Sequence, residues 1–416
     1  MAAGMDGTMS EYLEVAAGIA GRLLAEAIRD DGKCTWFGAS MEPIGGHWRP
    51  TRRTFGGDPY AGSSGVALFL AQLNRFQPTD QIKQTALAAI RHALDRAAND
   101  AALDRGALYV GTFGIGFAAA EVGSELGEEA IAAQGLDLIR DTLKSNDATA
   151  FDVVAGSAGR IGALVRLHQR LGEQWLIDAA VEEGGHLLAT AHRNAHGWSW
   201  GFGESPYVAH DLTGYSHGTA GVALALLELN AVASDPSFVQ AADEAMHYER
   251  TWFSPQQQNW PDFRRMPGQT AADPFAYGYA WCHGAPGIGM SRLRAYQLMK
   301  RPDILEDAQT ALRSARDASA ATATEYSFGI CHGAAGNAEL FLDAFEILGD
   351  EEWLALAETM ARRGIEEHHL GKRPWPCGLD DAGEAPGLML GLAGIGYFYL
   401  RMHGKRDVPS LLTIGA

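Results

Sequence analysis

The fold is decided by a short motif, which is complete in Trp281-Cys282-His283-Gly284-Ala285-Pro286-Gly287 and again in Cys331-His332-Gly333-Ala334-Ala335-Gly336. Both copies place a cysteine and a histidine directly before a Gly-x-x-Gly turn. The turn itself recurs along the chain, and internal repeats determine architecture before any local feature does. Its seven copies begin at Gly62, Gly111, Gly156, Gly218, Gly284, Gly333 and Gly391.

Each turn opens an apolar, alanine-rich run, such as V-A-L-F-L-A-Q-L over residues 66–73. Such a run predicts a helix that is buried on most sides. The segments between the runs, such as 80–97, carry apolar residues at helical spacing against charged ones, and they predict amphipathic outer helices. Successive first glycines are 45 residues apart (Gly111 to Gly156) to 66 residues apart (Gly218 to Gly284), which is enough for one outer and one inner helix.

An inner helix that is apolar nearly all round needs neighbours on both flanks, and a closed ring supplies them. The sequence therefore predicts an all-α fold, an (α/α) toroid of seven helical hairpins that forms one domain over residues 1–416, with residues 1–10 expected to be disordered. All seven turns should emerge at one end of the ring, where the amides and dipoles of the helix N-termini point inward. Cys282 and Cys331 should meet there although 49 positions separate them.

Two thiols and one imidazole are the donors expected of a zinc site with one coordination position left open, as in catalytic zinc. Sulfur ligands favour zinc over magnesium or calcium, and a helix N-terminus favours thiolate over thiol. The alternative for either Cys-His pair alone is packing, because cysteines are often buried as small apolar residues and histidines as satisfied donors.

The series Ser216-His217-Gly218-Thr219-Ala220-Gly221, followed by the two Cys-His motifs, resembles the lanthionine synthetase C-like cyclases, and the resemblance extends over nearly the whole chain. It implies a toroid with zinc at its centre, which adds a peptide cysteine thiol to dehydroalanine or dehydrobutyrine and so closes a thioether ring. Carried over by motif, the zinc ligands are Cys282, Cys331 and His332.

The resemblance also implies catalytic roles in the turns. His217 would protonate the enolate that follows sulfur attack, and Asp152 would assist or orient it; the alternatives are a structural histidine and a helix N-cap. His283 stands where stand-alone relatives often have tyrosine or asparagine, and it could donate to the enolate oxygen, bind the metal, or simply pack. Gly278 stands where some relatives place an arginine, so that residue cannot stabilise the enolate here.

Four long connections, 36–60, 194–213, 253–280 and 372–387, precede turns and should overhang the mouth of the site, because long loops in compact domains tend to be functional. Their aromatic residues could form a wall for a peptide or could cap the inner helices. Their arginines could capture carboxylates or could be merely solvated. These residues are Trp198, Trp200, Phe202, Trp260, Phe263, Phe275, Tyr277 and Tyr279, with Arg49, Arg52, Arg53, Arg264 and Arg265.

The composition indicates a cytoplasmic protein. The 33 basic and 51 acidic residues give a net charge of −18, which argues against nonspecific binding to nucleic acid. No apolar run is long enough to insert into a membrane, and the first residues lack a signal peptide. Cys34 and Cys377 remain as single thiols in a compartment where disulfides are unexpected.

The sequence thus predicts a zinc-dependent lanthionine or methyllanthionine cyclase. It would receive a dehydrated precursor peptide from a separate dehydratase or within a larger synthetase complex. One alternative adds glutathione or another small thiol to dehydrated residues, and another is a noncatalytic zinc scaffold that binds a modified peptide. An (α/α) glycosidase would need two carboxylates across the glycosidic bond, whereas the turns offer mainly Cys and His.

Overall fold

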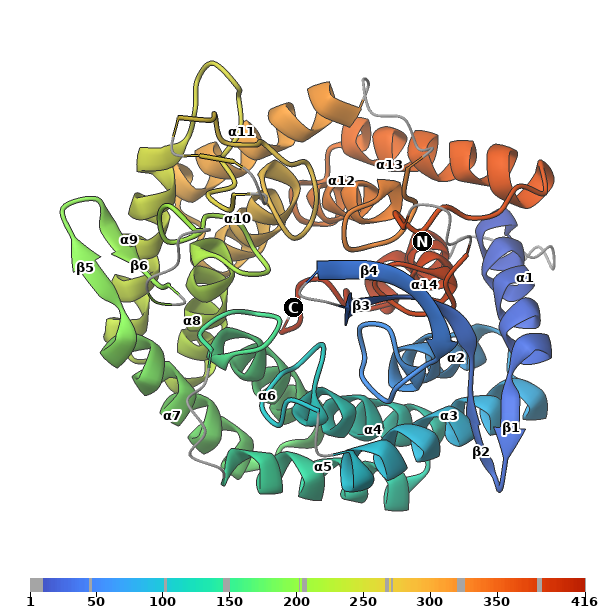
Figure 1. Cartoon of the computed structure of the whole chain (residues 1–416). Helices are drawn as coiled ribbons and strands as arrows, with labels where there is room; N and C mark the ends of the chain where they lie inside the picture. Colours follow the sequence, from blue (N-terminus) through green and yellow to red (C-terminus); the bar gives the residue numbers. More distant parts are fainter. Residues whose placement is uncertain are drawn as a thin grey trace.

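A computed structural model describes residues 10–44, 47–100, 103–144, 150–201, 203, 208–265, 269–270, 272–319, 326–379 and 384–415. Helices α1 to α14 form two concentric layers of a ring (Figure 1), which confirms the predicted toroid. The inner helices are α2 (Ser63–Phe76), α4 (Thr112–Leu126), α6 (Ser157–Leu171), α8 (Thr219–Ala233), α10 (Ala285–Met299), α12 (Ala334–Leu348) and α14 (Leu392–Gly404). The outer helices are α1 (Glu11–Glu26), α3 (Asp80–Asn99), α5 (Glu129–Leu143), α7 (Gln174–Thr190), α9 (Pro236–Trp252), α11 (Pro302–Ser319) and α13 (Glu351–Gly364), which continues as a π-helix, η1 (Ile365–Leu370).

The ring is closed by the two ends of the chain. Each inner helix from α2 to α12 packs against the outer helix that follows it, whereas α14 packs against an outer helix from the start of the chain. Its outer partner is α1, and α14 also contacts α2. The seventh hairpin is therefore built from segments about as far apart in sequence as the chain allows.

The second glycine of every turn faces a main-chain carbonyl from the loop before it. A Cβ atom added at any of the seven positions would lie between 1.6 and 2.2 Å from that oxygen, far inside van der Waals contact. This close approach explains why the Gly-x-x-Gly pattern recurs in each repeat. It also fixes the residues before the turn against the start of the inner helix.

The turns are joined to one another by main-chain hydrogen bonds around the ring. The residues involved stand two positions before the first glycine, with one exception at the third turn, where Val153 is the donor and Val154 the acceptor. The bonds run from Met389 N to Tyr60 O, Tyr60 N to Tyr109 O, Tyr109 N to Val154 O, Val153 N to Ser216 O, Ser216 N to Cys282 O and Cys331 N to Met389 O. Within the described residues, no such bond joins the Cys282 turn to the Cys331 turn, and the belt is open at that point.

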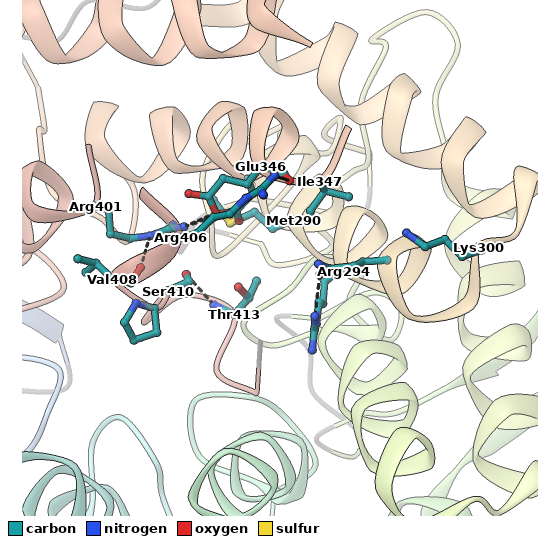
Figure 2. Close-up of a pocket in the computed structure, with 13 residues that line it drawn as sticks. Met290, Arg294, Lys300, Glu346, Ile347, Arg401, Arg406, Val408, Ser410 and Thr413 are labelled. Atoms are coloured by element: carbon teal, nitrogen blue, oxygen red, sulfur yellow. Dashed lines mark hydrogen bonds and ion pairs between the residues drawn. The ribbon is translucent and has the colours of Figure 1, made fainter. Parts of the chain in front are cut away.

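The C-terminal segment, 408–415, fills the middle of the ring beneath the turns (Figure 1). Tyr109 donates to the carbonyl of Leu411 at 2.6 Å, and Trp281 donates to that of Leu412 at 2.9 Å. A cavity of about 440 Å³ lies at the other end of the ring, between the last turns of α10 and α12 and this segment (Figure 2).

Three antiparallel hairpins accompany the helices: β1 (Ile28–Asp30) with β2 (Lys33–Thr35), β3 (Phe37–Ile44) with β4 (His47–Thr54), and β5 (His192–Asn194) with β6 (Gly197–Ser199). The connection 36–60 is thus mostly a β-hairpin, whose base packs through Ala39 against Cys377 and Ala385. None of the described helices is long and apolar enough to cross a bilayer.

Candidate metal centre and active site

The fourth, fifth and sixth turns carry reactive side chains, cysteine or histidine, at equivalent positions. Cys282 and Cys331 stand two residues before the first glycine of the fifth and sixth turns, and His217, His283 and His332 stand one residue before it in the fourth to sixth. The belt of hydrogen bonds holds these positions at the centre of the turn end. The repeat geometry therefore brings them together without any contact that is local in sequence.

Cys282, Cys331 and His332 form a group that could hold a metal ion. One ligand atom from each residue lies within 4.8 Å of the others. Four-coordinate zinc at ordinary bond lengths places two sulfur ligands about 3.8 Å apart, so the cluster needs to contract by at most about 1 Å. Burial lowers the pKa of His332, which keeps its imidazole neutral and able to bind a cation. The donor set and its spacing fit zinc.

The two thiols share a hydrogen bond that separates their affinities for a proton. This bond lowers the pKa of Cys282 and, together with burial, raises that of Cys331 well above its usual range. The guanidinium of Arg264 favours the thiolate form of both residues. Arg264 is held beside them by Asp262, whose carboxylate it contacts at 2.8 to 3.2 Å through two nitrogens.

A further contact to the cluster comes from Tyr60, which the sequence analysis missed. Its hydroxyl donates to Cys331 Sγ at 3.2 Å, and burial raises the pKa of Tyr60 well above its usual range, so the phenol keeps its proton. Tyr60 stands two residues before the first glycine of its own turn, the position that cysteine occupies in the fifth and sixth turns. That equivalence is the signal that could have revealed it.

His217 and Asp152 form a pair next to the cluster. His217 Nδ1 lies 2.6 Å from Asp152 Oδ2, while Asp152 Oδ1 accepts from the main-chain nitrogen of Ala155 at 2.7 Å. Asp152 is therefore both a turn cap and the partner of His217, and the two interpretations of this aspartate are compatible. The His217 side chain is 32% exposed and Asp152 is buried, so the imidazole faces the open side of the site.

His283 lies behind this pair, with its ring centroid 6.1 Å from that of His217. It is buried, and burial lowers its pKa to about 3, which leaves the imidazole neutral. Its Nε2 atom has no hydrogen-bond partner among the described residues. The group that could hold a metal within the described part of the chain does not include His283, which favours its role as a donor over that of a ligand.

Several aromatic side chains of the long loops are buried by packing, and the sequence analysis had left this open. Trp200, Trp260 and Phe263 are buried, and the two tryptophans donate to the main chain of α7 and α9. They cannot line a peptide site. Trp198, Phe275, Tyr277 and Tyr279 are partly buried, Arg52 lies over the ring of Phe37, Arg265 lies over Phe275, and Phe202 lies outside the described residues.

The last of these loops supports His332. Gly378 has φ +74°, which favours glycine, and a Cβ atom there would lie 2.8 Å from Nε2 of His332. Its nitrogen donates to the carbonyl of Tyr326 at 3.0 Å. The connection 372–387 therefore fixes the imidazole by direct contact.

A family model described as "Lanthionine synthetase C-like protein" matches residues 55–413, which span the turns and the cluster. The chain belongs to this family. No curated protein matches the sequence of this lanthionine synthetase C-like protein.

Among solved structures, this lanthionine synthetase C-like protein is similar to nisin cyclase, with a TM-score of 0.66, 16% identity, and coverage of 85% of this chain and 90% of that one. It is also similar to a GH76 alpha-mannanase from Bacteroides thetaiotaomicron (TM-score 0.51, 11% identity, 96% and 97% covered). A sugar epimerase from a ruminal bacterium gives a TM-score of 0.50 at 12% identity, with 96% and 100% covered. Identities this low establish a shared toroid and nothing about activity.

Proposed function

We propose that this protein is a zinc-dependent lanthionine or methyllanthionine cyclase, which closes thioether rings in a dehydrated precursor peptide. One observation carries the proposal: a metal-binding group of two thiols and an imidazole lies beside a histidine that is oriented by a buried aspartate. The family to which the chain belongs supports the same reaction. A glycosidase is disfavoured because the carboxylates at this site are already engaged, Asp152 by Ala155 and His217, and Asp262 by Arg264.

In the proposed reaction, the sulfur of a peptide cysteine bonds to the β-carbon of the dehydrated residue. The alkene electrons move towards the carbonyl and form an enolate. A proton then adds to the α-carbon, and it replaces the proton that the thiol lost. Zinc held by Cys282, Cys331 and His332 would supply the acidity that converts the incoming thiol to a thiolate.

His217 is the proton donor in this scheme. Its Nδ1 is held by Asp152, which fixes the plane of the ring, and the proton would be delivered from Nε2. The neutral His283 offers a hydrogen-bond donor to the enolate oxygen, and Arg264 offers positive charge beside the thiols. Arg264 would thereby stabilise the enolate, which Gly278 cannot do.

The substrate must be dehydrated beforehand, which calls for a separate dehydratase or a larger synthetase complex. We place the reaction in the cytoplasm, where substrate thiols stay reduced.

Mass spectrometry of a dehydrated peptide incubated with the zinc-loaded protein, with and without glutathione, tests the proposal. Ring closure leaves the peptide mass unchanged but removes its reaction with a thiol-trapping reagent. A product heavier by one glutathione would instead establish the small-thiol function. If the peptide stays unchanged and still reacts with the trapping reagent in both incubations, the protein is a noncatalytic scaffold.

A further inference from the structure

A second cavity opens directly beside the metal ligands. It has a volume of about 400 Å³ and lies between the ends of α11 and α13 and the start of α12. His332 and Tyr279 form its inner wall, and Leu356 and Met360 of α13 form its apolar outer wall. Because His332 belongs both to the cavity and to the metal cluster, whatever fills this space is in contact with the reacting centre.

The cavity coincides with the gap in the belt of hydrogen bonds. Around the rest of the ring the described turns are joined by their main chains, whereas the fifth and sixth are bridged by a side chain, Asn337. Asn337 Nδ2 donates to the carbonyl of Tyr279 at 3.0 Å. The cavity therefore lies between His332 at the central site and the two outer helices, α11 and α13.

Asn337 lines this space and bridges the two turns beside it. A carbonyl can only accept, so the atom of Asn337 that contacts Tyr279 must be the amide nitrogen. Asn337 itself is only 9% exposed, so it forms a fixed part of the cavity wall.

The geometry points to a specificity pocket for the peptide substrate, which takes an apolar side chain adjacent to the residue that reacts at the metal centre. This inference rests on the proposed cyclase function. The apolar side chain packs against Leu356, Met360 and Tyr279.

The apolar walls of the pocket disfavour a basic residue at that position. Arg316 and Arg363 line its outer part, but Arg316 is paired with Asp317 and Glu352, and Arg363 with Glu367, so their charges are balanced. A lysine side chain would lose its hydration between the apolar walls. The structure thus favours leucine-like over lysine-like neighbours of the reacting residue.

The test compares dehydrated peptides that carry Leu or Ala next to the reacting cysteine, on each side in turn. With the wild-type protein, kcat/KM for ring closure should favour Leu by about tenfold or more on one side, as expected for several methylene groups in an apolar pocket. Met360→Trp fills the pocket from the outer helix, and it should remove this preference while the zinc content stays at one ion per chain.

Two further variants complete the test. Thr359→Trp starts from an exposed residue that lines the same pocket, so it decides the matter if Met360→Trp fails to fold. Ala355→Trp adds the same bulk to an exposed position of α13 outside the pocket and should keep the wild-type preference. A wild-type protein with equal rates for Leu and Ala, or a filled pocket that still prefers Leu, overturns the inference. If the wild-type protein closes a ring in neither the Leu peptide nor the Ala peptide, the proposed function is overturned instead.

Discussion

The hydroxyl of Tyr60 lies 3.2 Å from the sulfur of Cys331, so the first turn of the ring donates a hydrogen bond to a ligand that belongs to the sixth. The two residues are 271 positions apart in sequence and are joined through Met389, which bonds to the main chains of both. Hydrogen bonds to ligand atoms tune metal sites nearly as strongly as the ligands themselves. The contact therefore links the first turn to the candidate metal centre.

Tyr60→Phe should weaken zinc binding by about 10- to 100-fold, because it removes this hydrogen bond and keeps the aromatic ring. Competition with a chelator measures the affinity. Tyr109→Phe is the matched control, since Tyr109 holds the same position in the second turn but donates to Leu411 O. That variant should lose about 0.5–1.5 kcal/mol of stability and keep its zinc affinity. Equal zinc affinity in Tyr60→Phe and the wild type would contradict the proposed contact.

Cys331→Ala should abolish stoichiometric zinc binding, because only Cys282 and His332 remain as donors and the lost thiolate is not replaced. Elemental analysis of the purified variant measures this. Cys34→Ala provides the comparison: Cys34 is equally buried but donates to the carbonyl of Thr85, and its loss should leave one zinc per chain. Full zinc content in Cys331→Ala would rule out the ligand assignment.

The sequence was sufficient to predict the ring and the grouping of Cys282, Cys331 and His332, because both follow from one repeated turn. Each second glycine is required by the same carbonyl contact, so the repeat could be read without knowledge of the fold. Cys282 and Cys331 then fell at equivalent positions, with His332 next to Cys331, and equivalence in sequence became proximity in space.

Features that depend on chain ends and on side-chain pairing could not be predicted in this way. The pairing of α1 with α14 joins segments with no common motif, and the strands β3 and β4 arise in a stretch rich in glycine and proline. Burial of Trp200, Trp260 and Phe263 depends on loop paths that span different hairpins. The bridge from Asn337 to Tyr279 likewise depends on side-chain pairing.

Glu346→Gln should flatten the pH dependence of stability. Glu346 lies beside Arg401 in the cavity at the far end of the ring (Figure 2), and burial raises its pKa from 4.5 to about 7. The folded protein thus binds this proton more tightly than the unfolded chain. The resulting stabilisation is complete below pH 4.5 and is lost as the pH rises through 7. Glutamine mimics the protonated form at every pH.

The measurement is the difference in Tm between pH 5 and pH 8, which should be smaller in Glu346→Gln than in the wild type. Glu352→Gln alters an exposed glutamate of α13 and should preserve the wild-type difference. If the two variants behave alike, the titration of Glu346 does not contribute to stability in this range.

His217→Asn should retain zinc and the fold but slow ring closure by about 10²- to 10⁴-fold, the contribution of a positioned general acid. Asparagine preserves the polarity at this half-buried position and removes the proton that the enolate requires. Ring closure is followed by mass spectrometry with a thiol-trapping reagent. Thioether formation by the zinc-loaded variant at the wild-type rate would show that another group is the acid.

Asp152→Asn separates the two roles of this residue, because its two oxygens have different partners. Asparagine can still accept from Ala155 N and caps about as well as aspartate, so the turn and the fold should persist. The partner of His217 Nδ1 becomes a neutral amide, which no longer stabilises the protonated imidazole. Ring closure should therefore slow to a similar or smaller extent than in His217→Asn. In Asp104→Asn, where the carboxylate accepts from the main-chain nitrogens of Gly106 and Ala107, the rate should stay at the wild-type value. The same rate in all three aspartate forms would reduce Asp152 to a turn cap and leave His217 without an orienting partner.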